Sequence, residues 1–172
     1  MNLALGLAMT LAAPLAMALM PAAAEDTATP PVKKNWFDDP FFQIASGLRA
    51  CPVPEGPLYT EAERRMQMHS RLERGTSCWL AGKCADSNAY RYDKPLAPKV
   101  EAALKAVPGV SRGSVWVMIQ RRWVYLQGCV PSHELALRLE HAARAVPDVE
   151  AVVPDLMLGS RGKPSYPVAL PP

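Results

Sequence analysis

Hydrophobic and polar positions alternate along residues 115–130, and this alternation predicts a β-hairpin. One parity carries aliphatic side chains on both sides of a polar tip: Val115, Val117, Ile119, Val124, Leu126 and Val130. The other parity carries larger or more polar side chains: Trp116, Met118, Gln120, Trp123, Tyr125, Gln127 and Cys129. Two period-2 runs rich in β-branched and aromatic residues are typical of a hairpin. We expect the aliphatic face to meet a core and the aromatic face to need a cover, from this chain or from a partner.

Helical spacing flanks the hairpin on both sides. Before it, apolar residues fall at i, i+3, i+4 and i+7 and stop at Pro108-Gly109: Val100, Ala103, Leu104 and Val107. After it, Ser132 can cap a second helix with its own apolar stripe: Leu135, Leu139, Ala142, Ala143 and Val146. Residues 149–158 give a third strand, in which Pro154 favours an edge position or a bulge. This order predicts an α+β fold, a small αββαβ sandwich with a three-stranded sheet and two helices on one face.

The sequence predicts an amino-terminal extension over residues 25–94, followed by the αββαβ domain over residues 95–158. It holds one helix near residues 60–74, which begins with a capping box at Thr60 and Glu63 and ends at Gly75. Large apolar residues crowd the segment of residues 35–48, and we expect this segment to dock on the aromatic face of the hairpin. The alternative is a short amphipathic helix that packs elsewhere. Residues 159–172 are rich in Gly, Pro and Ser and predict a disordered tail.

The first 24 residues carry no charged side chain, and the small residues Ala22-Ala23-Ala24 precede Glu25. This pattern predicts a secretory signal peptide that is cleaved after Ala24. The alternative is a permanent membrane anchor. Pro14 and Pro21 interrupt the apolar stretch, which favours cleavage.

Four cysteines follow the predicted signal: Cys51, Cys78, Cys84 and Cys129. An even number in an oxidising compartment predicts two disulfides, with three possible connectivities. Because few residues separate Cys78 from Cys84, a local bridge between them closes at low entropic cost, and Cys51–Cys129 is then the second bridge. Such a bridge would hold the amino-terminal segment across the aromatic face. The alternative is buried free thiols.

Charge and motifs exclude several classes of function. The chain of 172 residues has 19 basic and 16 acidic residues, a net charge of +3, and the two signs are interleaved, which argues against nucleic-acid binding. A zinc site of His69 with Cys78 and Cys84 has an unusual ligand spacing, and His133 and His141 lie two helical turns apart. Redox, nucleophile-elbow, phosphate-loop and metalloprotease motifs are all missing from the sequence. We therefore expect no cofactor and no catalytic residues.

Residues 95–158 contain a series of short apolar motifs: Val107-Pro-Gly-Val110, Val115-Trp-Val117, Val124-Tyr-Leu126-Gln-Gly128-Cys-Val130, Val149-Glu-Ala-Val152 and Leu156. In these motifs the region resembles the BON domain, a periplasmic and outer-membrane-associated module of bacteria. Gly128 is expected to give a sharp exit from the second strand. The sequence departs from the family where Gln120-Arg121-Arg122 replaces a Gly or Asn at the hairpin tip, where Asp148 replaces a Gly, and where Pro154 replaces an Asn.

The resemblance implies binding to phospholipid or to an envelope protein, and no catalysis. We therefore predict a non-enzymatic, periplasmic, envelope-associated binding module. The alternative is a structural or accessory subunit of an envelope or secretion assembly that uses the aromatic sheet face as a protein interface. Bare aromatic side chains would favour a protein partner, whereas covered ones would leave the binding to the hairpin tip or the helices.

The predicted contact residues for lipid or a partner are Arg121, Arg122 and Trp123 at the hairpin tip. Two cations beside an indole suit the interface of an anionic membrane, where each Arg contributes about 1 kcal/mol. The alternative is that the two arginines only solubilise the tip and that the amino-terminal segment covers Trp123.

Overall fold

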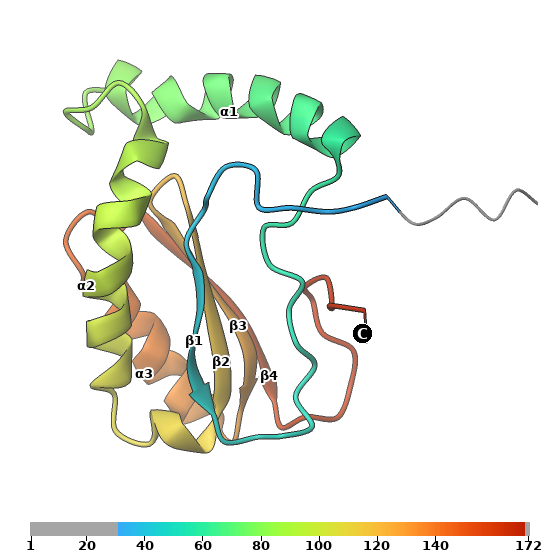
Figure 1. Cartoon of the computed structure of the whole chain (residues 1–172). Coiled ribbons are helices and arrows are strands. Elements are labelled where there is room, and N and C mark those ends of the chain that lie inside the picture. The colour runs from blue at the N-terminus through green and yellow to red at the C-terminus, as the bar shows by residue number, and fades with distance from the viewer. Residues whose placement is uncertain (1–30, 171–172) are drawn as a thin grey trace, which may run out of the picture. The chain divides into compact units, whose positions relative to one another are not determined.

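A four-stranded sheet organises the part of the chain that the computed structural model describes, residues 31–170 (Figure 1). Its strands are β1 (Phe41–Ser46), β2 (Ser114–Gln120), β3 (Trp123–Val130) and β4 (Ala151–Leu158), in the order β1-β2-β3-β4. The β1–β2 and β2–β3 pairs are antiparallel, and β3–β4 is parallel. The fold is α+β, as predicted. The predicted signal peptide of residues 1–24 lies outside the described residues.

The prediction of three strands was wrong by one, because the amino-terminal segment contributes β1. This strand pairs along β2, from Phe41 opposite Met118 to Ser46 opposite Ser114. Without it, β2 would present a long row of unpaired backbone groups at the sheet edge. The apolar segment therefore docks beside the hairpin, in the sheet, and does not lie across the aromatic face. An apolar run this short cannot be recognised as a strand from its periodicity.

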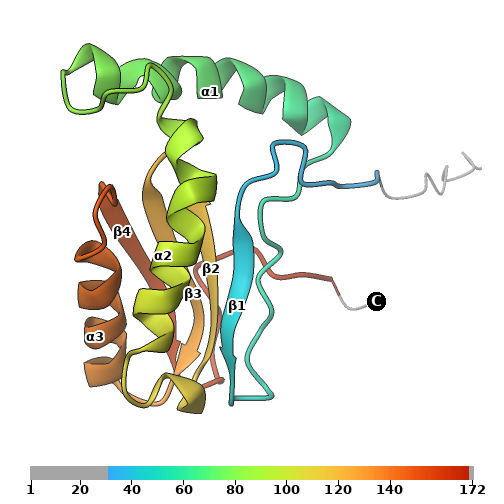
Figure 2. The ribbon, with the colours of Figure 1, turned by 60° about the vertical axis from the view of Figure 1, so that its left-hand side comes forward.

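Two helices cover one face of the sheet (Figure 2), as the sequence predicts: α2 (Asp93–Lys105) and α3 (His133–Arg144). The aliphatic parity of the hairpin faces them, and its side chains are fully buried: Val115, Val117, Ile119, Val124, Leu126 and Val130. The helices contribute the other half of the core: Leu96, Val100, Leu104, Leu135, Leu139 and Ala143. The aliphatic face therefore meets a core, which confirms the expectation from the alternation.

A third helix, α1 (Glu61–Leu80), lies across the end of the sheet that carries the hairpin tip (Figure 1). The capping box is present, since the Glu63 amide donates to the Thr60 hydroxyl and the Thr60 amide donates to the Glu63 carboxylate. The predicted end at Gly75 was wrong. Gly75 is buried inside the helix, where an added Cβ would lie 2.8 Å from Asn88 Oδ1. This glycine allows close approach to the short 3-10 helix η1 (Ala89–Tyr92) and does not cap α1.

The second face of the sheet is covered by two segments without regular structure, residues 51–59 and residues 159–170. The disulfide Cys51–Cys129 joins the first segment to β3. The second segment is not a disordered tail where the structure describes it. The Glu55 amide donates to the Pro167 carbonyl and the Ala169 amide to the Val53 carbonyl, both at 2.9 Å. The buried Tyr166 donates its hydroxyl to the Pro52 carbonyl. We call these two segments together the lid.

Candidate functional site

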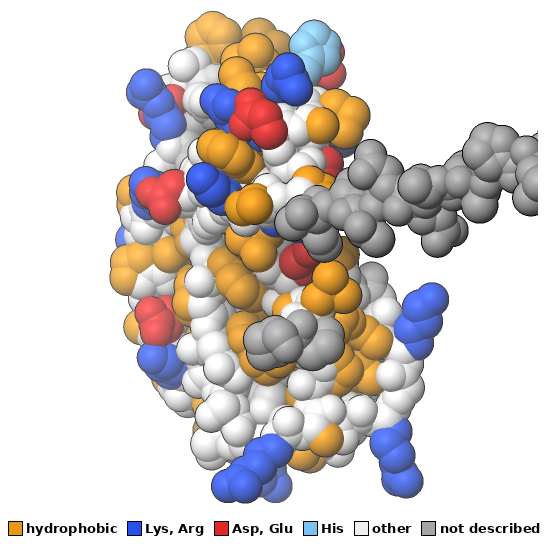
Figure 3. Space-filling view, turned by 45° about the vertical axis from the view of Figure 1, so that its right-hand side comes forward, with side chains coloured by type: hydrophobic (Ala, Val, Ile, Leu, Met, Phe, Trp, Pro, Cys, Tyr) orange, Lys and Arg blue, Asp and Glu red, His pale blue; other side chains and the backbone are white. Residues whose placement is uncertain are grey.

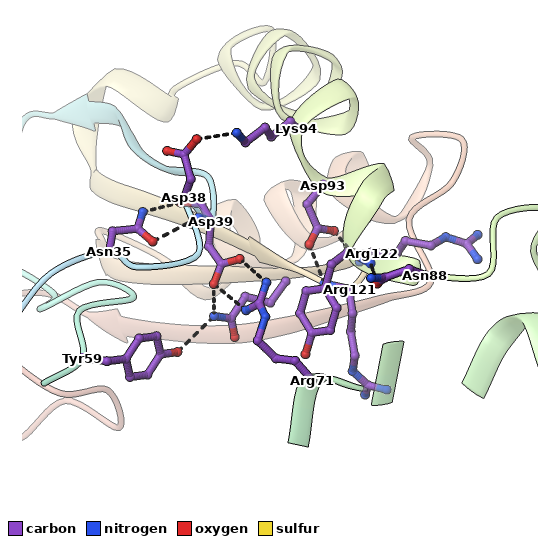
Figure 4. A network of polar contacts seen from close by, with 12 residues as sticks. Asn35, Asp38, Asp39, Tyr59, Arg71, Asn88, Asp93, Lys94, Arg121 and Arg122 are labelled. Atoms are coloured by element: carbon purple, nitrogen blue, oxygen red, sulfur yellow. Dashed lines mark hydrogen bonds and ion pairs between the residues drawn. The ribbon is translucent and has the colours of Figure 1, made fainter. Parts of the chain in front are cut away.

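The hairpin tip consists of Arg121 and Arg122, and both residues have positive φ angles, 46° and 68°. They connect the paired residues Gln120 and Trp123, at positions where primed two-residue turns usually have Asn and Gly. The carboxylate of Asp93 stabilises this backbone (Figure 4). It accepts the Arg121 amide on Oδ2 and the Arg122 amide on Oδ1, both at 2.7 Å. A carboxylate from α2 therefore supports a turn that the local sequence does not favour.

Asp93 is 2 % exposed, and burial raises its pKa to about 6. The two tip amides and the Arg71 guanidinium act against this rise, whereas the nearby carboxylate of Asp39 adds to it. Desolvation of the charged form is therefore the dominant influence on this group. The sequence analysis missed Asp93, because it lies at the end of a segment without periodicity. Its only signal is an acidic residue just ahead of a helical pattern.

The predicted contact residues Arg121, Arg122 and Trp123 lie together at the tip, and all three are half-buried. The Arg121 guanidinium lies 4.3 Å from the centre of the Trp123 ring. Arg122 is turned toward β4, since its Nε donates to the Asp148 carbonyl at 2.8 Å and its guanidinium lies 5.0 Å from the Tyr92 ring. Arg121 is thus held by its own neighbour on the hairpin, whereas Arg122 has a structural bond to the turn before β4.

A buried ion pair joins α1 to the same end of the sheet. Arg71 of α1 donates through Nη1 and Nη2 to the two carboxylate oxygens of Asp39, at 2.8 and 2.7 Å (Figure 4). Its guanidinium lies 4.2 Å from the Phe37 ring and 3.7 Å from the Tyr90 ring. Gln120, the last residue of β2, also donates to Asp39. Because this pairing is bidentate and buried, it fixes the position of α1 over the tip.

The aromatic face of the hairpin is neither bare nor fully buried. Trp116, Met118 and Tyr125 are half-buried, and burial raises the pKa of Tyr125. The lid lies over this face, and a hollow of about 290 Å³ remains between Met118 and Gln127 of the sheet and Pro57 and Pro167 of the lid. This chain therefore supplies its own cover, although the segment that does so is not the one the sequence predicts.

Both disulfides join the pairs that the sequence predicts, Cys51–Cys129 and Cys78–Cys84. The first holds the lid, not the segment of residues 35–48. The second closes the turn that follows α1. His69 was one residue of the zinc site considered from the sequence. It lies on the surface of α1, where its Nε2 is 3.6 Å from Oε1 of Glu73. Within residues 31–170, no cluster of His, Cys, Asp and Glu has the arrangement needed to hold a metal ion.

One comparison with known proteins finds a match, and it covers the region around the tip. The family model of the BON domain matches residues 92–159. This match begins at the residue before Asp93 and includes the tip, α2, α3 and three of the four strands. It excludes α1, β1 and most of the lid. No curated protein and no solved structure matches this chain. None of the helices in the described region is long and apolar enough to span a membrane.

Proposed function

Because the family model of the BON domain matches residues 92–159, we propose that the protein is a non-enzymatic binding module of the bacterial cell envelope that contacts anionic phospholipid. BON domains bind phospholipids or act as envelope-associated modules, and in general they are not enzymes. Two disulfides fit an exported protein in an oxidising compartment, which agrees with the predicted signal peptide and a periplasmic location.

One observation carries this proposal: the tip keeps cationic and aromatic side chains partly exposed next to one another, although α1 lies over it. There, Arg121 stacks on the Trp123 ring. An indole next to a guanidinium suits the boundary between headgroups and acyl chains, where the cation faces phosphate and the ring faces carbon.

The alternative function, a protein interface on the aromatic face, has less support. Such an interface needs Trp116 and Tyr125 to be free, but the lid lies over that face and Cys51–Cys129 joins the lid to β3. A partner would have to displace the lid, one segment of which is covalently attached to β3 through Cys51.

Co-sedimentation with vesicles tests the proposal. The protein should sediment with phosphatidylglycerol-containing vesicles at low salt, and less at high salt, but not with pure phosphatidylcholine vesicles. Arg121→Glu should weaken binding by about thirtyfold, since it changes the charge by two units and each unit near an anionic surface is worth about 1 kcal/mol. Arg121 is the better position to change, because Arg122 also bonds to the Asp148 carbonyl.

Arg112→Glu is the matched control. Arg112 lies in η2 (Val110–Arg112), just before β2 and hence at the opposite end of this strand from the tip, and it is exposed. This variant has the same net charge as Arg121→Glu and should bind nearly as well as the unchanged protein. Equal losses in both variants would exclude a specific role of the tip. No binding of the unchanged protein to anionic vesicles would overturn the proposed function.

A further inference from the structure

The outer face of α1 carries a concentration of exposed apolar side chains. Figure 3 shows hydrophobic side chains gathered over this helix at the top of the view. The exposed fractions are 64 % for Met66, 46 % for Met68, 71 % for Leu72, 49 % for Trp79 and 73 % for Leu80. No other element of the described structure has as many large apolar side chains exposed. Such a concentration of exposed apolar side chains on one helix indicates a surface that binds a protein or a membrane.

The helix has a docked face and a free face. Gly75 and Cys78 are buried, and Arg71 on the same side makes the ion pair with Asp39. At 3.6 residues per turn, Met68, Leu72 and Trp79 fall within a narrow arc beside this docked face. Leu80 and Met66 lie further round the helix. The exposed apolar side chains are therefore held in fixed positions, because Arg71, Gly75 and Cys78 dock α1 next to them.

The charges on α1 are unevenly paired. Each of its acidic residues has a partner: Glu61 pairs with Arg64, Glu63 closes the capping box with Thr60, and Glu73 lies beside His69. Within the described residues, by contrast, no acidic side chain pairs with Arg65 or Arg74 of the helix, or with Lys83 just after it. The unpaired charge at this helix is therefore positive.

The Cys78–Cys84 disulfide fixes the end of this surface. It closes a turn in which the Lys83 amide donates to the Cys78 carbonyl at 2.8 Å. Trp79, Leu80 and Lys83 consequently stay close together. This turn therefore holds together an aliphatic side chain, an indole and an ammonium group. At a membrane surface, such groups lie at the acyl chains, at the interface and among the headgroups, respectively.

We propose that α1 lies flat on an anionic bilayer, with its exposed apolar side chains at the hydrocarbon boundary and its unpaired cations among the phosphates. This inference rests on the proposed function and assigns the contact to an element outside the BON domain. A bilayer fits better than a protein partner, because Arg65 and Lys83, which have no acidic partner among the described residues, lie near the exposed apolar side chains and complement anionic headgroups, whereas Arg74 faces the sheet near Tyr90 and Tyr125. Arg121 at the nearby tip would then add to the same contact.

The test replaces three of the most exposed side chains with the triple variant Met66→Ser, Leu72→Ser and Leu80→Ser. Binding to phosphatidylglycerol-containing vesicles should fall by about tenfold or more, because the apolar area that enters the interface is lost. Leu137→Ser on α3 is the control, since Leu137 is 51 % exposed on a different helix. Its binding should equal that of the unchanged protein, and circular dichroism of both variants should show native helix content.

Trp79 provides a second readout that needs no change to the apolar surface. The Trp fluorescence of the protein should shift to the blue and be quenched by brominated acyl chains when vesicles are added. Trp79→Phe should remove the part of this change that comes from Trp79 and leave the part that comes from Trp123 at the tip. If the unchanged protein binds vesicles while the triple variant binds equally well, or while Trp79 shows no shift, α1 is not the contact and the proposed function stands. If the unchanged protein does not bind, the proposed function itself fails.

Discussion

At the scale of single residues, Asp93 explains how a hairpin tip of two arginines folds. Positive φ angles at both tip positions are unfavourable for residues with a Cβ. The Asp93 carboxylate offsets this cost, because each of its oxygens accepts one of the two tip amides. The turn is thus specified by a residue distant in sequence, which is why the tip sequence by itself does not determine the turn type.

Asp93 also gives a prediction for the pH dependence of stability. Its pKa is about 6 in the folded protein, above the ordinary value of 3.8. Between these values the folded state binds the proton more tightly than the unfolded state, so the contribution of Asp93 to the free energy of unfolding falls as pH rises from 4 to 6. Relative to Asp93→Asn, which does not titrate, the protein should lose about 2 kcal/mol over this range in urea unfolding. A constant difference between the two proteins would contradict the assigned pKa.

Gly128 gives a second prediction at this scale. Its φ is +123°, and a Cβ at this position would lie 2.1 Å from the Ser114 carbonyl oxygen on the adjacent strand. Gly128 lies within β3, so it permits close approach of β2 and does not mark the exit from the strand. Gly128→Ala should lower the free energy of unfolding by roughly 3 kcal/mol or more. Gly82→Ala is the control, because Gly82 also has a positive φ but open space around it; it should cost only about 1 kcal/mol. Similar losses of stability in the two variants would show that backbone strain, and not the close approach of β2, accounts for the effect of Gly128→Ala.

At the scale of elements, Arg71 determines whether α1 stays docked. Arg71→Ala would leave the carboxylate of Asp39 buried without its cation, since the Asp39 side chain is only 2 % exposed. We expect a loss of roughly 3 to 5 kcal/mol in the free energy of unfolding, together with faster amide exchange along α1. The control is Lys105→Ala, which breaks an exposed pair with Glu101 and should cost less than about 0.5 kcal/mol. A loss as small as that of the control would show that Arg71 does not hold the helix.

The elements also show which parts of the fold the sequence could predict. The hairpin, α2 and α3 follow from local periodicity, because each buries one regular face in a common core. Strand β1 and the lid could not be predicted in this way. Their positions depend on pairing with residues far away in sequence, such as Phe41 with Met118 and Glu55 with Pro167. The apolar content of residues 35–48 indicated docking but not the edge at which it occurs.

The candidate site was predictable only in part, for a similar reason. Arg121, Arg122 and Trp123 are adjacent in sequence, so their clustering was evident. Asp39, Arg71 and Asp93, which support the tip and α1, come from three separate segments and meet only in the folded chain. The exposed apolar side chains of α1 could not be recognised as a surface, because helical spacing alone does not show which side of a helix is docked.

At the scale of the whole described molecule, the two disulfides should differ in their effect on stability. Cys51–Cys129 spans 78 residues and Cys78–Cys84 spans 6. Since a longer closed loop removes more entropy from the unfolded chain, replacing the first pair with Ser should cost about 4 kcal/mol and the second about 2 kcal/mol. Loss of the Cys51–Cys129 bridge should also expose the aromatic face, so the protein should bind more of a dye that fluoresces on hydrophobic surfaces. Equal costs, or an unchanged aromatic face, would mean that the lid is held without the bridge.

The lid stays over the aromatic face while α1 and the hairpin tip contact an anionic membrane; this is the central claim about how the molecule binds its ligand. Hydrogen–deuterium exchange with and without phosphatidylglycerol-containing vesicles measures this claim directly. We predict slower exchange at residues 61–80 and 120–123 when vesicles are present, with no change in the lid or in α3. Protection of α3 with none in α1, or faster exchange in the lid, would contradict it.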